Sequence, residues 1–156
     1  MPHVEAASAP PAPTVPDGYV AMRVARVAPL PEGNAVLLAT SEGSAVLPIF
    51  VGETEALSID RRLAQQPFER PLTHDLFDAA LHELGGAVTH VRVDSIQGGT
   101  FIGTVFVRTA TRAFSLDARP SDAIALAIRA KAPVLVEDRV FDKSDLLPGP
   151  GSAPRI

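Results

Sequence analysis

The feature that most restricts the fold is an internal repeat. Residues Thr54–Ile59 and Ser121–Leu126 share one order of side-chain types: hydroxyl, acid, alanine, aliphatic, small, aliphatic. Each stretch follows a run of residues that is typical of a buried strand. Two unrelated amphipathic helices could share this order, because hydroxyl and acidic residues are favoured at any helix N-terminus. We prefer a duplication, which predicts two β-β-β-α units with Glu55 and Asp122 at equivalent strand-to-helix junctions.

Hydrophobic periodicity predicts the elements of each unit. In the first half it predicts strands around residues 20–24, at Asn34–Thr40 and at Ser44–Val51, a turn at Glu42-Gly43, and helices at Gly52–Gln65 and Thr73–Leu84. In the second half it predicts strands at Ala87–Ile96, Thr100–Arg108 and Arg112–Ala118, a turn at Gly98-Gly99, a helix at Pro120–Ala130 and a strand at Val134–Glu137. Phe114 and Leu116 should point inward. The expected fold is an α+β domain whose duplicated units form a mixed or antiparallel sheet with helices packed on it.

The folded domain is expected over residues 18–145. Residues 1–17 are rich in Ala and Pro, and residues 146–156 in Pro and Gly, which predicts a disordered arm and a flexible tail. The N-terminal residues lack the positive leader of a secretory signal, and no apolar run approaches the roughly 20 residues that span a bilayer. We therefore expect a cytoplasmic protein with no membrane partner.

Charge and cysteine usage limit the chemistry. The chain has no cysteine, which excludes disulfides, thiolate catalysis and cysteine-ligated metal centres, so that any metal must bind oxygen or imidazole. The net charge of −4 argues against a protein that coats nucleic acid, although a compact groove can still be locally positive. Arginines 61, 62, 70 and 119 are candidates to line such a groove, and they can equally be scattered, solvated side chains.

Four ordered motifs carry a family resemblance. They are Leu47–Gly52 with Glu55-Ala56, then Arg70–Leu76, then Gly99–Phe101, and above all Asp117–Ala127. In this order they resemble the bifunctional nuclease domain family over roughly residues 19–140. The resemblance implies an α+β domain, a homodimer with a large groove as the active site, and cleavage of DNA and RNA. It implies no agreed mechanism, so the chemistry has to be argued from the residues.

The second predicted helix opens with residues suited to phosphate chemistry. Thr73 is a natural N-cap, and His74 and Asp75 then lie where backbone N–H groups point outward. We name His74 and Asp75 as candidate catalytic residues, with Arg70 and Thr73 as substrate-binding residues. Alternatively, His74 satisfies the local loop by hydrogen bonds, and Asp75 is a first-turn acid that interacts with the helix dipole.

The segment Asp117–Asp122 brings two carboxylates, a guanidinium and a helix N-terminus within six residues of sequence. We name Asp117 and Asp122 as catalytic candidates, Arg119 and Ser121 as substrate-binding candidates, and Glu55 with Asp117 and Asp122 as ligands for a possible Mg²⁺ or Mn²⁺ ion. The alternative is structural: either aspartate pairs with Arg119 and fixes the turn.

The sequence therefore predicts a nuclease that hydrolyses DNA and RNA with little sequence preference. The alternative is a non-catalytic dimeric binding or regulatory module whose motif acids are structural. Ser58, Ser121 and Ser144 do not indicate a hydrolase triad, because no Gly-x-Ser-x-Gly elbow is present. No phosphate-loop or dinucleotide fingerprint is present either.

Overall fold

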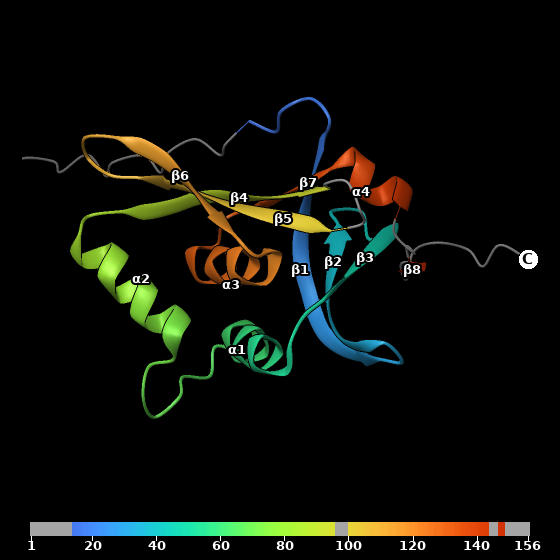
Figure 1. Ribbon diagram of the computed structural model, residues 1–156, viewed down its shortest axis with the longest axis horizontal. Helices are drawn as coiled ribbons and strands as arrows, with labels where there is room; N and C mark the ends of the chain where they lie inside the picture. The colour runs from blue at the N-terminus through green and yellow to red at the C-terminus, as the bar shows by residue number, and fades with distance from the viewer. Residues whose placement is uncertain (1–13, 96–99, 144–146, 149–156) are drawn as a thin grey trace, which may run out of the picture.

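One mixed β-sheet organises the protein (Figure 1), which is described by a computed structural model over residues 14–95, 100–143 and 147–148. The elements are β1 (Tyr19–Leu30), β2 (Gly33–Thr40), β3 (Ala45–Phe50), α1 (Glu53–Leu63), α2 (Thr73–Glu83), β4 (Ala87–Ser95), β5 (Phe101–Arg108), β6 (Ala113–Ala118), α3 (Pro120–Ala130), β7 (Val134–Glu137), α4 (Asp138–Lys143) and β8 (Leu147–Pro148). The strands lie in the order β6-β5-β4-β7-β1-β2-β3-β8.

The sheet contains the two predicted units. Strands β1, β2 and β3 form an antiparallel meander that leads into α1, and β4, β5 and β6 form a second one that leads into α3. Between them lies β7, antiparallel to β1 and parallel to β4. Glu55 and Asp122 each occupy the third position of their helix. The predicted α+β class and the order of the strands and helices are confirmed.

Helices α1 and α3 lie on one face of the sheet, where the core forms (Figure 1). The run Ala123–Ala127 of α3 is entirely buried, and it packs on valines of β4 and β5 such as Val91 and Val105. Each fully buried Val or Ile side chain contributes about 1.5–3 kcal/mol relative to an exposed one. The core therefore fixes α3, and with it the β6–α3 turn, firmly against the sheet.

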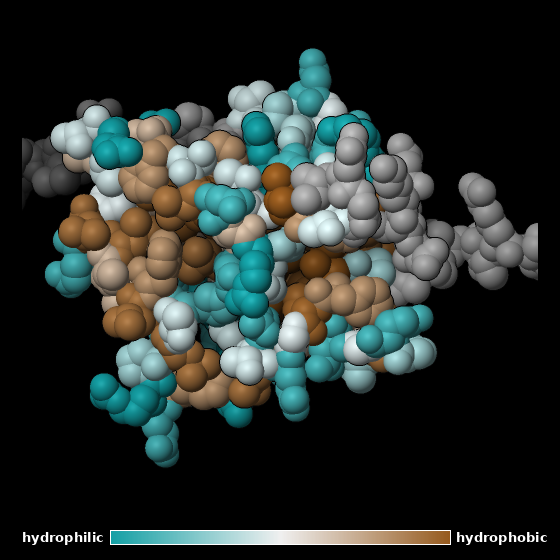
Figure 2. Space-filling model, viewed as in Figure 1, coloured by the Kyte–Doolittle hydropathy of each residue, from teal (hydrophilic) through white to brown (hydrophobic). Residues whose placement is uncertain are grey.

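Helix α2 is attached much more loosely. It has no buried residue, and Leu84 is 80% exposed, whereas Leu81 packs against the core. Leu116 is less buried than predicted, because it lies on the edge strand β6, where its side chain is 37% exposed. Phe114 of the same strand does pack against the core. Hydrophobic side chains gather on the side of the molecule where α2 and β6 lie (Figure 2).

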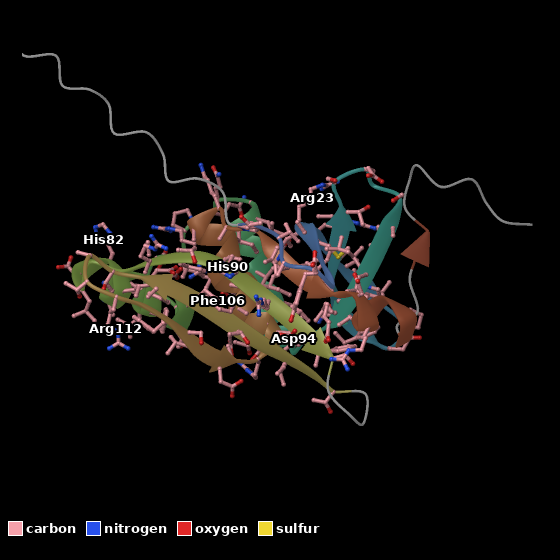
Figure 3. The ribbon with its side chains drawn as sticks, turned by 90° about the horizontal axis from the view of Figure 1, so that it is seen from above. Arg23, His82, His90, Asp94, Phe106 and Arg112 are labelled. Carbon is pink, nitrogen blue, oxygen red and sulfur yellow. The ribbon has the colours of Figure 1, made fainter. Side chains whose placement is uncertain are left out.

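The face of β4 and β5 that points away from α3 carries polar and aromatic side chains (Figure 3). The rings of His90 and Phe106 stack with centroids 4.1 Å apart, and the Arg92 guanidinium lies over the rings of Phe106 and Tyr19. Burial and, secondly, the nearby Arg92 charge lower the pKa of His90. Burial and a hydrogen bond donated to Asp94 raise the pKa of Tyr19 to about 12.

Some predictions fall outside the described residues, or differ at the C-terminal end. The Gly98-Gly99 turn, residues 1–13 of the predicted arm and residues 149–156 of the predicted tail are not described. Helix α4 and strand β8 were not predicted, and Leu147-Pro148 pairs with β3 inside the segment assigned to the tail. A two-residue strand has too little periodicity to be read from sequence. None of the described helices is long and apolar enough to cross a membrane.

Candidate active site

Arg119 joins the two halves of the protein at the N-termini of α1 and α3. Its Nε and Nη2 donate to the two carboxylate oxygens of Asp122 at 2.8 and 3.0 Å, and its Nη1 donates to Glu55 Oε1 at 3.0 Å. Glu55 and Asp122 are the acids that the repeat places at equivalent positions, so one guanidinium bridges the two junctions. The Arg119 side chain is nonetheless 63% exposed.

His74 reaches this cluster from the start of α2. Its Nε2 lies 2.8 Å from Asp122 Oδ1, and its Nδ1 lies 2.8 Å from the Ser58 hydroxyl, which belongs to α1. A carboxylate accepts hydrogen bonds only, so Nε2 carries a proton, and in the neutral form of the ring Nδ1 accepts from the Ser58 hydroxyl. Ser58 is 5% exposed and has no access for a nucleophilic attack, so its hydroxyl orients the imidazole.

Asp122 is the electrostatic centre of the cluster. Burial on its own would raise the pKa of Asp122, but the hydrogen bonds from Arg119 and His74 outweigh burial and hold this pKa below its usual value. The same contacts, led by the hydrogen bonds to Asp122, raise the pKa of Arg119. Asp122 is therefore ionised at neutral pH and Arg119 is charged.

Asp75 has a capping role. Its Oδ2 accepts the backbone N–H of Leu72 at 2.9 Å, and its Oδ1 accepts from Arg62 Nη2 at 3.0 Å. The prediction that Thr73 is the N-cap is wrong: α2 begins at Thr73, the N-cap position is Leu72, and the Asp75 carboxylate supplies the cap. The sequence alone could not identify Arg62 as the partner of Asp75, because Arg62 lies on a different helix, α1.

The remaining predicted residues lie apart from the cluster. Asp117 and Arg70 are exposed, and the side chain of neither makes a hydrogen bond or ion pair with another described residue. Thr73 is exposed on the first turn of α2, whereas Ser121 is buried in the first turn of α3. The structure thus brings together His74, Asp122, Arg119 and Glu55 from the predicted set and leaves Asp117 outside their contacts.

Two of the three predicted cation ligands share Arg119 as a partner. Arg119 hydrogen-bonds to both Glu55 and Asp122, whereas the Asp117 side chain makes no hydrogen bond or ion pair with another described residue. No group of three or more His, Asp or Glu side chains that could hold a metal ion occurs in the part of the chain that is described.

Comparison with known proteins assigns the chain to a family. The profile of the bifunctional nuclease domain matches residues 36–148, a span that contains the whole cluster from Glu55 to Asp122. The chain belongs to the bifunctional nuclease domain family. Similar proteins include an uncharacterized protein of Mycobacterium tuberculosis, 39% identical over 114 residues that cover 72% of this chain and 66% of the relative.

Plant relatives are more distant and longer. Bifunctional nuclease 1 of Oryza sativa subsp. japonica is 29% identical over 76% of this chain and 37% of its own length, and Bifunctional nuclease 1 of Arabidopsis thaliana is 30% identical over 65% and 33%. The chain thus spans just under two thirds of the mycobacterial relative and about a third of the plant proteins.

Three further residues of this family member shape the site: Ser58 and Gly103 were not predicted, and Arg62 was predicted only as a groove-lining or solvated arginine. Ser58 orients His74, and Arg62, whose side chain is only 6% exposed, ties Asp75 to the Ala125 carbonyl of α3. Gly103 on β5 lies under the β6–α3 turn, where an added Cβ would meet the Arg119 carbonyl oxygen at 2.8 Å. Only the glycine gave a local signal, as an interruption in a strand pattern.

Proposed function

We propose that the protein is a nuclease that hydrolyses phosphodiester bonds of DNA and RNA at the cluster of His74, Asp122, Arg119 and Glu55. The observation that carries this proposal is the convergence of an exposed guanidinium, an ionised carboxylate and an oriented histidine at two helix N-termini. Family membership supports the class of reaction. Neither α1 nor α3 has a side-chain cap at its N-terminus, so N–H groups of both first turns can contribute to binding an anion.

In the proposed reaction, Arg119 binds the non-bridging phosphate oxygens through charge-assisted hydrogen bonds. A water oxygen forms a bond to phosphorus, and the ester bond to one sugar oxygen breaks. Asp122 Oδ2, which among the described residues accepts only from Arg119 Nε, takes the proton of the water and returns one to the departing oxygen, so the charge of Asp122 is unchanged after the reaction. Ser58 holds the imidazole in the orientation in which it donates to Asp122 Oδ1.

Local charge limits the approach of phosphate. With a neutral His74, two carboxylates face one guanidinium, so the cluster carries a net charge of −1 before substrate arrives. Binding a phosphodiester there requires additional positive charge, from protonation or from a divalent cation. A requirement for Mg²⁺ or Mn²⁺ therefore stays a prediction, which a chelator tests directly.

The second candidate function is a non-catalytic dimeric binding or regulatory module. It is favoured because the carboxylates of the motif acids already have hydrogen-bond partners. Asp75 accepts from the backbone N–H of Leu72 and from Arg62, and both oxygens of Asp122 accept from Arg119. In this interpretation the cluster stabilises the junction of the two halves. Exposed ion pairs contribute only about 0–1 kcal/mol each, so such a role would be modest in energy.

The homodimer is also part of the proposal. Its support is the apolar surface left on α2 and β6, including Leu76, Leu84 and Leu116, which a second copy of the chain would cover. Surfaces of this kind on a monomer are typical of interaction sites.

The decisive experiment measures cleavage and thermal stability together on labelled single-stranded DNA and RNA, with Mg²⁺, Mn²⁺ or chelator. Asp122→Asn and His74→Ala should each lose about 100-fold or more in rate, equivalent to roughly 3 kcal/mol of transition-state stabilisation. Asp60→Asn, an exposed acid of α1, is the matched control. Loss of activity only in proportion to unfolding would support the non-catalytic module, and full activity in chelator would exclude the cation.

A further inference from the structure

A cavity of about 1090 Å³ lies behind His74, between α1, the 64–72 loop, α2 and the C-terminal end of α3. Ser58 lines this cavity and hydrogen-bonds to His74 at 2.8 Å, so the wall of the cavity at Ser58 borders the proposed active site. Its volume lies just above the range for sites that bind small organic ligands, about 300–1,000 Å³.

The cavity carries cations without ion-pair partners. Arg61, Arg129 and Lys131 line it, and none of them forms an ion pair with another described residue. Arg62 also lines it, 6% exposed, with its Nε lacking a hydrogen-bond partner. The acids of the cavity are Glu69, together with Asp75 and Asp78, which both pair with Arg62. The unpaired positive charge at the ends of α1 and α3 favours an anionic ligand.

Two cavity residues adopt an unfavourable backbone conformation. Gln65 and Lys131 have φ of 53° and 52°, and they are the non-glycine residues with positive φ in the described part of the chain. They follow α1 and α3, where glycine is the usual residue because it has no steric penalty. Both side chains line the cavity. Backbone strain that is kept in order to retain a polar side chain is typical of functional sites.

The other side chains of the cavity suit a nucleotide. Arg61 stacks over the Phe68 ring at 5.2 Å, which provides a flat surface for a base, and the amides of Gln65 and Gln66 can hydrogen-bond to base edges. We propose that the cavity binds one nucleotide of a single-stranded nucleic acid, next to the phosphodiester that faces Arg119 and His74. This inference rests on the proposed nuclease function and names its substrate as single-stranded.

Glycine substitution separates ligand binding from stability. Lys131→Gly and Gln65→Gly relieve the positive-φ strain, so their melting temperatures should be unchanged or higher, while both lose a side chain of the cavity. Isothermal titration calorimetry with adenosine 5′-monophosphate should show about tenfold weaker binding for each variant and for Arg129→Gln, as expected when one contact to an ionised group is lost. Arg26→Gln, an exposed arginine of β1 outside the cavity, should bind like the unmodified protein.

The ligands of the titration define the site further. Adenosine and inorganic phosphate should each bind more weakly than the monophosphate, and a trinucleotide should bind more tightly. Unchanged affinity in Lys131→Gly and Arg129→Gln, or a trinucleotide that does not bind, would overturn the proposal. The titrations are repeated with Asp122→Asn, which retains the cavity. If the protein binds the nucleotide but cleaves nothing, the proposed nuclease function is refuted and the proposed nucleotide site in the cavity stands. If the protein cleaves nucleic acid but the cavity variants do not change binding, the nucleotide site is refuted and the nuclease function stands.

Discussion

The substitution Gly103→Ala tests whether the β6–α3 turn positions Arg119. A Cβ at this position would lie 2.8 Å from the Arg119 carbonyl oxygen, 2.9 Å from its carbonyl carbon and 3.0 Å from the Ala118 oxygen. All three atoms belong to the backbone, and the turn is fixed by the buried α3, so the strand and the turn must separate. Overpacking of this kind costs about 1–3 kcal/mol, against which alanine recovers roughly 0.5–1 kcal/mol of backbone entropy.

We therefore expect Gly103→Ala to lose about 1–2 kcal/mol of unfolding free energy, or roughly 2–8 °C in melting temperature for a chain of this length. Cleavage should fall further than the loss of folded protein explains, because Arg119 moves with its backbone. Gly52→Ala is a control for stability only: its Cβ would meet the flexible side chain of Glu55, which can move but belongs to the proposed active site. Calorimetry and cleavage rates measured at one temperature separate the two effects. Equal stability of Gly103→Ala and the unmodified protein would refute the close approach as a constraint.

Three further predictions follow from the contacts. Ser58→Ala leaves His74 Nδ1 without its hydrogen-bond partner, so it should cost about 1–2 kcal/mol in unfolding free energy and lower the cleavage rate. The control Ser115→Ala, on the exposed side of β6, should change neither. An unchanged cleavage rate in Ser58→Ala would show that Ser58 is not part of the site. Folding lowers the pKa of His90, so as pH falls below about 6.5 His90 is protonated in the unfolded chain before it is protonated in the folded protein. The unfolding free energy should therefore fall with pH, by at most about 1.4 kcal/mol per pH unit. His90→Phe should flatten melting temperature against pH in this range, with His82→Gln as control, and an unchanged slope would count against the effect. Light scattering at micromolar concentration should give a mass of twice one chain. Leu84→Glu, which places a charge on the exposed apolar surface, should lower this mass towards that of one chain. A monomer mass for the unmodified protein would contradict the predicted homodimer.

The strands and helices were predictable because their signals are local. Alternation marks β4 and β5, and the proline at the first position of α3 marks its start. The internal repeat also predicted a relation between distant residues, because it placed Glu55 and Asp122 at equivalent positions. In the structure both acids bind Arg119. These predictions needed only patterns within about a dozen residues, or a comparison of two such patterns.

The contacts of His74 and Asp75 were not predictable, because they depend on where α2 lies relative to α1 and α3. Ser58 is 16 positions from His74 in sequence, and Arg62 reaches a carbonyl 63 positions away. Nothing local distinguishes these two polar residues from others on α1. The apolar stripe of α2 was equally ambiguous: periodicity shows which side is hydrophobic, but not whether this chain or another copy covers it.

The bridge through Arg119 connects the architecture to the proposed chemistry. A duplicated unit places an acid at each strand-to-helix junction, and two such acids close together repel unless a cation lies between them. Arg119 supplies that charge with three of its nitrogens, and its exposure leaves the guanidinium accessible to solvent. A guanidinium has five N–H donors and the bridge uses three, so the other two remain for a phosphate that approaches Arg119. The guanidinium that stabilises the junction is then also the group proposed to bind the substrate, and for this reason stability and cleavage have to be measured on the same variants.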